Sequence, residues 1–457
     1  MGVSGLAFLM IYAGGVMAAL MRGPIYGLCT YVMVMFLHPP SRWWGVGLPW
    51  VRWSLVAAVV SLLAYMLHPR KEERVDSIWR NGVFVGYVLL VVYMIAQYSW
   101  ALRPEKHLEL IELYLKYLVM MFLIYRSVES NDTLRALLWS FVLGSFYISW
   151  VAFTEHTGGR FEGFGGADIG DSNAGGLTLA CAVFVGGALF LEGKTRTRLV
   201  LLVLMPFIVN GIILTASRSA TLALGVGGLL YLRFTPKAYR GITNFFSVLA
   251  IFGFIALASQ DYLDRMTTLF YAGQDKAVVT ESGRTYNASG SGRKETFMAQ
   301  WEMFKANPLG HGHRGTAALS PLYLDDAFLT GPVGARARSS HNTFMTALVE
   351  HGVLGAIVYV FMVLWIYTRL RRLVPVYRQR RDLRALMIPT LAAVLGGITV
   401  GDQFVDYFKY EPRLWFIAML FVMLRWARHE QRAEAEARAV AAQAASPPRQ
   451  QLAARGY

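Results

Sequence analysis

Charged residues are scarce in this chain of 457 residues. They make up 16% of it, against about 25% in an ordinary soluble domain. Hydrophobic residues make up 55%, which leaves too few polar side chains to cover the surface of a soluble protein of this size. The two cysteines, Cys29 and Cys181, lie inside apolar stretches, so the sequence offers neither a disulfide framework nor a thiolate metal site. These shortages exclude a soluble enzyme, a disordered chain and a disulfide-rich scaffold.

Long apolar runs take the place of the missing polar residues. A bilayer core requires about 20 apolar residues as helix, and runs of about that length recur along the chain. They lie near 53–67, 83–99, 108–125, 134–153, 174–191, 198–215, 219–233, 243–259, 343–368, 385–401 and 412–427. Two more apolar stretches, 3–21 and 24–37, form either one broken helix or two short ones. We therefore predict an all-α, polytopic integral membrane protein with about 12 transmembrane helices.

The basic residues are divided unevenly between the connecting segments. The chain has 44 Lys and Arg against 29 Asp and Glu, a net charge of +15. One alternate set of segments holds 25 of the basic residues, and the short segments of the other set hold 8. The positive-inside rule makes the first set cytoplasmic, together with the C-terminus. Most of the excess charge then reflects topology, and we expect no nucleic-acid partner.

The one long polar interruption, 260–341, then lies on the outer face. Within it Phe297, Trp301 and Phe304 follow the spacing of an amphipathic helix, which ends at Asn307-Pro308 and is expected to lie on the outer leaflet. Four regions follow from this pattern. They are an N-terminal transmembrane bundle (1–259), the outer loop region with amphipathic helices (260–341), C-terminal transmembrane helices (342–427) and a basic cytoplasmic tail (428–457).

Several arginines lie on the outer face, where the positive-inside rule disfavours them. Arg218 stands between two apolar runs with almost no loop. An arginine so close to hydrocarbon either faces a partner or cavity, or extends to the headgroup region. Arg160 and Arg293 are loop residues, for which a solvated charge is the alternative. Guanidinium groups gathered on one face suit bidentate contacts with phosphate oxygens.

Histidines provide the other candidates for chemistry. His341 opens a long predicted helix, where the helix dipole disfavours the imidazolium cation. A neutral imidazole at pH 7 can act as a general base, and an ordinary residue at a helix start is the alternative reading. His311 and His313 stand two residues apart with no third ligand pattern, which is a weak metal signal, so we predict no metal site.

The order of these motifs resembles the O-antigen ligase / O-antigen polymerase superfamily, which also includes bacterial O-linked oligosaccharyltransferases. The N-terminal half, with Met21-Arg22-Gly23-Pro24 and His38-Pro39-Pro40, is similar to the exosortase-associated O-glycosylation ligases. The other matching motifs are Arg160 in a Gly-rich loop leading to Asp171-Ser172-Asn173; Ser217-Arg218-Ser219; Arg293 with Trp301 and Asn307-Pro308-Leu309-Gly310-His311-Gly312; and His341-Asn342-Thr343-Phe344 with Glu350-His351-Gly352-Val353-Leu354-Gly355.

The resemblance implies a GT-C-like fold with one large helical periplasmic loop, in the bacterial inner membrane, with the active site facing the periplasm. It implies a glycosyltransferase without a cofactor: an O-antigen ligase that moves a polysaccharide from undecaprenyl diphosphate to a sugar hydroxyl of lipid A–core, with inversion, in lipopolysaccharide biosynthesis. By similarity, Arg218, Arg293 and His341 are the catalytic residues. The further residues expected to contact the diphosphate or the glycan are Arg160, Arg265, His313, Arg338 and Asn342.

Three alternatives remain open at this point. An O-antigen polymerase and a protein O-oligosaccharyltransferase share the donor chemistry, so the arginines do not separate them from a ligase. A transporter or flippase is a different class of protein. The absence of an inverted repeat and of charges scattered through many spans argues against transport.

Overall fold

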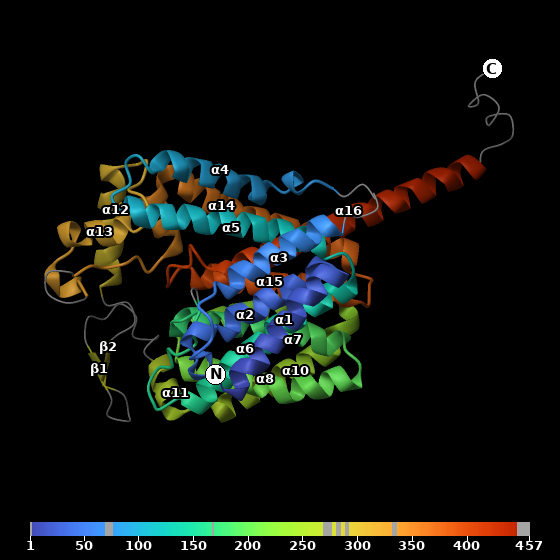
Figure 1. The fold of residues 1–457 in the computed structure, drawn as a ribbon, viewed down its shortest axis with the longest axis horizontal. Coiled ribbons are helices and arrows are strands. Elements are labelled where there is room, and N and C mark those ends of the chain that lie inside the picture. Colours follow the sequence, from blue (N-terminus) through green and yellow to red (C-terminus); the bar gives the residue numbers. More distant parts are fainter. Residues whose placement is uncertain are drawn as a thin grey trace, which may run out of the picture.

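The computed structural model describes residues 2–68, 76–166, 169–267, 277–279, 285–287, 292–330 and 336–445. These residues form a bundle of helices, with one short hairpin beside it (Figure 1). The first helices are α1 (Val3–Arg22), α2 (Pro24–Leu37), α3 (Trp53–Leu67), α4 (Gly82–Gln97), α5 (Pro104–Ser127), α6 (Asn131–Glu155), α7 (Ser172–Glu192), α8 (Thr195–Thr215) and α9 (Arg218–Phe234). The later ones are α10 (Arg240–Leu257), α11 (Gln260–Thr267), α12 (Arg293–Ala306), α13 (Gly315–Tyr323), α14 (Thr343–Tyr377), α15 (Leu383–Gly401) and α16 (Glu411–Ala445).

Short elements connect the helices. Strands β1 (Ala277–Val279) and β2 (Thr285–Asn287) pair antiparallel, with Val278 opposite Tyr286. The 3₁₀ turns are η1 (Pro39–Ser41), η2 (Trp43–Gly45), η3 (Ile78–Arg80), η4 (Lys237–Tyr239) and η6 (Asp326–Phe328). The all-α prediction therefore holds for the bundle, and the hairpin lies within the predicted outer loop region.

The first 37 residues form two helices and not one broken helix. Gly23 has φ 120°, a conformation that side chains rarely adopt, and it ends α1. Pro24 stands at the first position of α2, where its fixed φ suits the helix and its missing N–H costs no hydrogen bond. The sequence Gly-Pro therefore separates the two helices.

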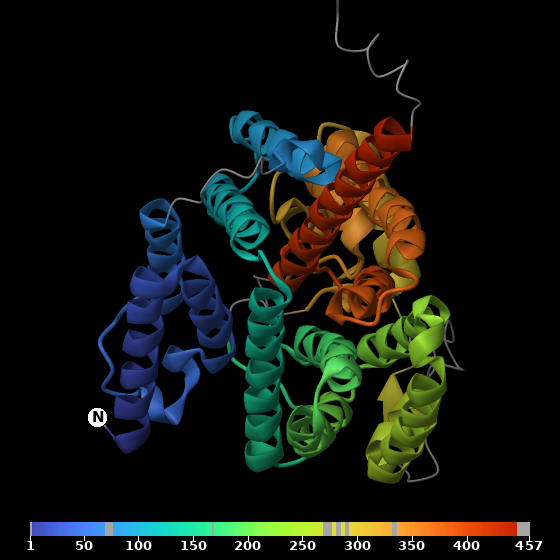
Figure 2. The ribbon, with the colours of Figure 1, turned by 90° about the vertical axis from the view of Figure 1, so that its right-hand side faces the viewer.

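The centre of the bundle is formed late in the chain. Helix α15 packs against α9 and α7, and α7 also packs against α8. Almost every side chain of α15 is buried, and α16 contributes the buried rings of Trp415, Phe416 and Phe421. Figure 2 shows the red α16 above the green helices, with the blue N-terminal helices at the left. The late helices α15 and α16 therefore contribute much of the buried core.

Among the described residues, seven helices are long and apolar enough to cross a membrane: α1, α6, α7, α8, η4–α10, α14 and α15. Helices α2, α3, α4 and α9 are also apolar, but they have only 14, 15, 16 and 17 residues. The prediction of about 12 spans is thus neither confirmed nor excluded by helix length. The chain is a multi-pass membrane protein by this measure.

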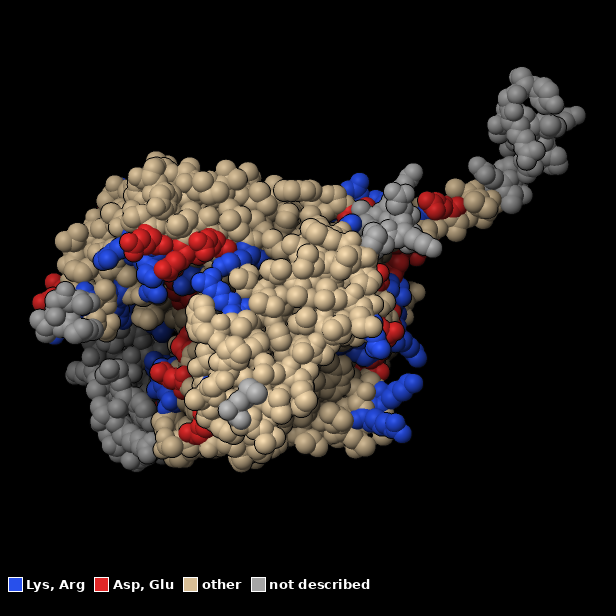
Figure 3. Space-filling model, viewed as in Figure 1, with Lys and Arg blue, Asp and Glu red and all other residues tan. Residues whose placement is uncertain are grey.

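The outer surface of the bundle fits contact with lipid. Helix α10 buries only Thr243 and exposes large apolar side chains such as Phe245, Phe252 and Ile255. A soluble protein rarely exposes an apolar surface of this extent. Figure 3 shows charged side chains gathered toward the two ends of the bundle, with a largely uncharged band between them.

Two predictions about the later chain are answered by the helix bounds. The helix predicted around Phe297 and Trp301 is α12, which buries Thr296 and Met303 and exposes Phe297 and Trp301. Its position on the outer leaflet stays a prediction. Helix α16 continues past the last predicted span to Ala445, so much of the predicted tail is helical. The remainder of the tail, 446–457, lies outside the described residues.

Candidate active site

Arg218 is held at the turn between α8 and α9. Ala216 ends α8 with φ 44°, and Ser217 caps α9 by accepting a hydrogen bond from the backbone N–H of Ala220 (3.3 Å). The Ser217 hydroxyl also donates to Oδ1 of Asn173 on α7 (2.9 Å). Arg218 is therefore the first residue of α9, at a helix end that is tied to the neighbouring helix.

Arg160 reaches the same turn from the preceding loop. Its Nη2 donates to Oδ1 of Asn173 (3.1 Å), and its Nε donates to the carbonyl oxygen of Thr215 (3.4 Å). Asn173 thus accepts hydrogen bonds from both Arg160 and Ser217. Asp171 caps α7 through the backbone N–H groups of Asn173 and Ala174. The predicted motif 171–173 therefore holds the loop and the α8–α9 turn together.

Arg293 approaches from the outer segment as the first residue of α12. Gly292 precedes it with φ 70°, and a Cβ there would lie 2.9 Å from the Phe328 ring. The Arg293 guanidinium lies over the ring of Phe404, 5.5 Å from its centroid. Arg338 lies close by, anchored by its backbone N–H to Ser320 (2.7 Å) and by Nη1 to the carbonyl oxygen of Phe328 (3.0 Å).

His341 immediately precedes α14. Its neighbour Asn342 caps that helix by accepting from the backbone N–H of Met345 (3.0 Å) and donates to Oε1 of Gln403 (3.4 Å). The His341 side chain is exposed, yet desolvation by the surrounding protein lowers its pKa, and the charges of Arg338 and Arg293 lower it further. The imidazole is neutral at pH 7.

The four arginines and His341 form one electrostatic group, which we call the arginine cluster (Arg160, Arg218, Arg293, Arg338 and His341). Desolvation, followed by the charges of Arg293 and Arg160, lowers the pKa of Arg218. Desolvation and the charge of Arg338 lower the pKa of Arg293. In each case the electrostatic contribution comes from a neighbouring cation. Gathered cations repel one another, and an anion placed among them would remove that cost.

A break in α14 fixes the position of Arg293 relative to His341. Gly352 has φ 64° and ψ −160° inside the helix. The segment after α12 inserts at this break, where backbone N–H groups of His311 and Gly312 donate to Val349 and Glu350 (3.0 and 2.8 Å) and that of Val353 donates to Pro308 (3.0 Å). We call this pairing the α14 latch (308–312 with 349–353). It joins the helix that starts at Arg293 to the helix that starts beside His341.

The start of α14 is also anchored by a buried acid. Asp402 pairs with Arg413, accepts from the Thr343 hydroxyl (2.8 Å) and accepts from the Tyr359 hydroxyl (3.0 Å). The Thr343 backbone N–H donates to the Asp402 carbonyl oxygen (2.8 Å). Asp402 is thus bound both to Arg413 and to the helix that follows His341.

Two of the predicted site residues, His313 and Arg265, lie outside the arginine cluster as it is defined above. His313 is buried, with its Nδ1 2.8 Å from Glu350 Oε2, and its backbone N–H donates to Nδ1 of His107 (3.0 Å). His313 thus belongs to a buried network and not to the arginine cluster. Arg265 lies on α11, which packs beside the start of α9 through Tyr262 and its hydrogen bond to Thr221 (2.7 Å).

His107 and Gln97 are polar residues that sequence reasoning missed. His107 accepts from His313 and therefore donates from Nε2 to the Met94 carbonyl oxygen (2.8 Å), which defines a neutral ring. Oε1 of Gln97 lies within hydrogen-bond distance of His351 Nδ1 (3.0 Å), and its Nε2 donates to the Glu350 carbonyl oxygen (2.8 Å) at the latch. Gln97 lies in an apolar run and His107 lies just before one, and neither stretch gives a local signal of these partners.

The structure also shows how the two neighbouring histidines are used. His311 directs Nε2 to the carbonyl oxygen of Met303 (2.8 Å), whereas His313 turns toward Glu350. Within the described ranges, no three His, Cys, Asp or Glu side chains are grouped as metal ligands.

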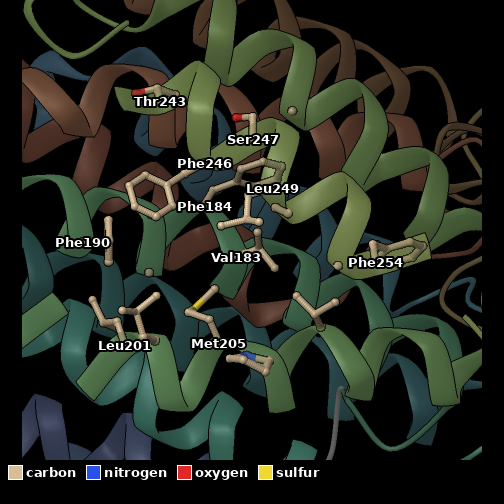
Figure 4. Close-up of a pocket in the computed structure, with 18 of the residues that line it drawn as sticks. Val183, Phe184, Phe190, Leu201, Met205, Thr243, Phe246, Ser247, Leu249 and Phe254 are labelled. Atoms are coloured by element: carbon tan, nitrogen blue, oxygen red, sulfur yellow. The ribbon is translucent and has the colours of Figure 1, made fainter. Parts of the chain in front are cut away.

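An apolar cavity of about 360 Å³ lies between α7, α8, α9 and α10. Figure 4 shows side chains such as Met205 and Phe246 directed into it from facing helices. At one end Phe254 contacts the ring of Tyr262, with centroids 5.6 Å apart, and Tyr262 bonds to Thr221 one turn from Arg218. The cavity thus extends from the lipid-facing side of the bundle toward the arginine cluster.

Comparison with known proteins agrees with these motifs. No curated protein matches the chain significantly. Residues 199–360 match the family described as O-Antigen ligase. The matched region contains Arg218, Arg293, Arg338, His341 and the α14 latch, and it supports an enzyme of O-antigen ligase or polymerase type. The match over residues 199–360 therefore supports the resemblance to the O-antigen ligase / O-antigen polymerase superfamily.

Proposed function

We propose that this protein is an O-antigen ligase of the bacterial inner membrane. It would transfer a polysaccharide from undecaprenyl diphosphate to a sugar hydroxyl of lipid A–core on the periplasmic face. The observation that carries the proposal is the convergence of Arg218, Arg293 and Arg338 around an accessible, neutral His341. Grouped guanidinium cations suit a diphosphate, and a neutral imidazole beside them suits removal of a hydroxyl proton.

The donor diphosphate would bind within the arginine cluster. Arg160 and Arg218 approach from the bundle, and Arg293 and Arg338 approach from the outer segment. As the glycosidic bond to phosphate breaks, its electron pair passes to the leaving lipid diphosphate. Guanidinium groups already in place stabilise that charge in a site of low dielectric, where such interactions are strong. The arginines would thereby take the electrostatic role that a divalent cation plays in other phosphate chemistry.

The lipid part of the donor would occupy the apolar cavity beside α10. Its lining includes Val183, Met205 and Phe246, and its end at Phe254 approaches the start of α9 through Tyr262. Polyprenyl chains are wholly apolar, so such a cavity gains favourable burial from them. Helix α10 has few buried side chains, which would allow the polyprenyl chain of the donor to enter the cavity from the membrane.

His341 would accept the proton of the acceptor hydroxyl while the new bond forms. The acceptor oxygen attacks the anomeric carbon from the side opposite to the departing diphosphate, which inverts the configuration at that carbon. The lowered pKa of His341 keeps the ring neutral and ready to accept a proton at neutral pH. The proton then passes from the imidazolium to water.

Reconstitution with three acceptors tests the proposal. Purified protein in vesicles receives labelled glycan on undecaprenyl diphosphate together with lipid A–core, a second lipid-linked repeat, or an acceptor protein. Labelled lipid A–core is the expected product. Labelled lipid-linked chains would instead identify an O-antigen polymerase, and labelled protein would identify an O-oligosaccharyltransferase. Uptake or translocation of the glycan without transfer would refute the enzyme proposal.

A further inference from the structure

A second cavity, of about 210 Å³, lies at the other end of the same helices. It is lined by the end of α9 and the turn after it, by the last turn of α14 and by the first turns of α15. Arg218 begins α9 and Arg233 stands near its end, so a rise of 1.5 Å per residue separates the two ends by roughly 20 Å. The basic segments of this end belong to the set that the positive-inside rule makes cytoplasmic.

Four cations converge on this cavity from three parts of the chain. They are Arg233 in the last turn of α9, Lys237 after α9, Arg240 at the start of α10 and Arg378 after α14. Arg233, Lys237, Arg240 and Arg378 are all exposed. In the part of the chain that the structure describes, none of them has a carboxylate within ion-pair distance.

The acids at this end of the bundle have other cationic partners. Asp382 pairs with Arg380 (3.1 Å), and Glu430 pairs with Arg380 and Arg384 (2.6 Å each). Glu192 pairs with Arg135. The positive charge of the cavity is therefore not neutralised by these neighbouring carboxylates.

The rest of the lining is largely apolar. It includes Phe234, Val374 and Ile388, together with Thr235 and Tyr377. A cavity lined by both cations and apolar side chains matches a phospholipid, whose phosphate and acyl chains are joined. A free phosphate would use only the cations.

We propose that this cavity, lined by Arg233, Lys237, Arg240 and Arg378, binds the head group of an anionic phospholipid of the inner leaflet. The phosphate lies among the four cations, and the first carbons of the acyl chains lie against Phe234. Anionic lipids give the cytoplasmic leaflet a negative surface potential that attracts such basic clusters. The bound lipid connects the α9–α10 turn to α14 and α15, whose opposite ends reach the arginine cluster.

Matched variants distinguish a built site from general surface charge. The full-length protein is placed in phosphatidylethanolamine vesicles with and without phosphatidylglycerol, and bound lipid is measured by native mass spectrometry. The test variant carries Arg233→Gln, Lys237→Gln and Arg378→Gln. The control variant carries Arg196→Gln, Arg371→Gln and Arg372→Gln, which removes the same charge from exposed residues outside the cavity.

Phosphatidylglycerol is expected to bind the wild type and the control variant equally, and the test variant about tenfold more weakly or worse. Arg378→Gln alone removes one exposed side chain and should weaken binding about threefold or more. This single variant tests the proposal if the triple variant does not fold. Soluble glycerol phosphate should not compete. Equal losses in both triple variants would overturn the proposal in favour of diffuse charge, and competition by glycerol phosphate would overturn it in favour of a phosphate site.

Discussion

Replacing Gly352 by alanine should disrupt the α14 latch and move Arg293 away from His341. The residue has φ 64° and ψ −160°, a region that essentially only glycine occupies. An added Cβ would lie 2.3 Å from the carbonyl oxygen of Pro308 and 2.5 Å from the carbonyl carbon of Leu309. The backbone of 308–309 must therefore move, because it cannot rotate away as a flexible side chain could.

The cost can be assembled from the contacts at the latch. Holding alanine in this backbone conformation costs about 1–3 kcal/mol. Moving the 308–312 segment also loosens three backbone hydrogen bonds, those of His311, Gly312 and Val353, each with a net contribution of about 0.5–1.5 kcal/mol. We expect Gly352→Ala to destabilise the protein by roughly 3 kcal/mol or more. Glycan transfer should fall as well, because Arg293 and His341 lie on the two sides of the latch.

Thermal unfolding of the purified protein and glycan transfer below the unfolding range are the two measurements. Gly225→Ala on α9 is the matched control, since an added Cβ there meets nothing within 4 Å and helical alanine is favoured over glycine by about 1 kcal/mol. A Gly310→Ala change presses on the same latch, with a Cβ 2.4 Å from the Gly352 nitrogen. The double variant should therefore lose less than the sum of the single losses. A Gly352→Ala protein with wild-type stability and transfer would refute this reasoning.

Three further outcomes are expected. Arg338→Gln removes a cation that lowers the pKa of His341, so the acid limb of the pH profile of transfer should move to higher pH. An unchanged acid limb would show that it does not report the titration of His341. Asp402→Asn leaves the buried Arg413 without its counter-charge and should lower the free energy of unfolding by about 3–5 kcal/mol; an unchanged thermal midpoint would contradict the anchoring role. Transfer should persist in EDTA because arginines supply the positive charge at the diphosphate; complete loss with EDTA and recovery with Mg²⁺ or Mn²⁺ would overturn that assignment.

The residues of the arginine cluster could be named as candidates from the sequence, and their catalytic roles stay predictions. Arg218 and Arg293 stood out because their segments are predicted to lie on the face that the positive-inside rule keeps poor in cations. The spacing of Phe297, Trp301 and Phe304 predicted α12, and its end at Asn307 followed from the proline after it. Such features depend on local composition and periodicity, which a single sequence displays.

The features that the sequence did not predict depend on contacts between residues far apart in the chain. Gly352 stands within an apolar run that predicts an unbroken helix, and its break exists only because 308–312 pairs with it. His313 appeared to share the outer face with the arginines, but the partner that orients it is Glu350. Likewise, the span count was uncertain because several apolar helices fall just below the length of a bilayer core.

The most direct test of the proposed mechanism is the rate of labelled glycan transfer from undecaprenyl diphosphate to lipid A–core in vesicles of purified protein. Arg218→Ala and Arg293→Ala should each lower the rate by about 10²–10³-fold, as expected when a donor to a developing oxyanion is lost. His341→Ala should lower it by about 10²–10⁴-fold, and the control Arg196→Ala should leave it unchanged. Near-normal transfer by the folded His341→Ala protein, or by either arginine variant, would contradict the proposed mechanism.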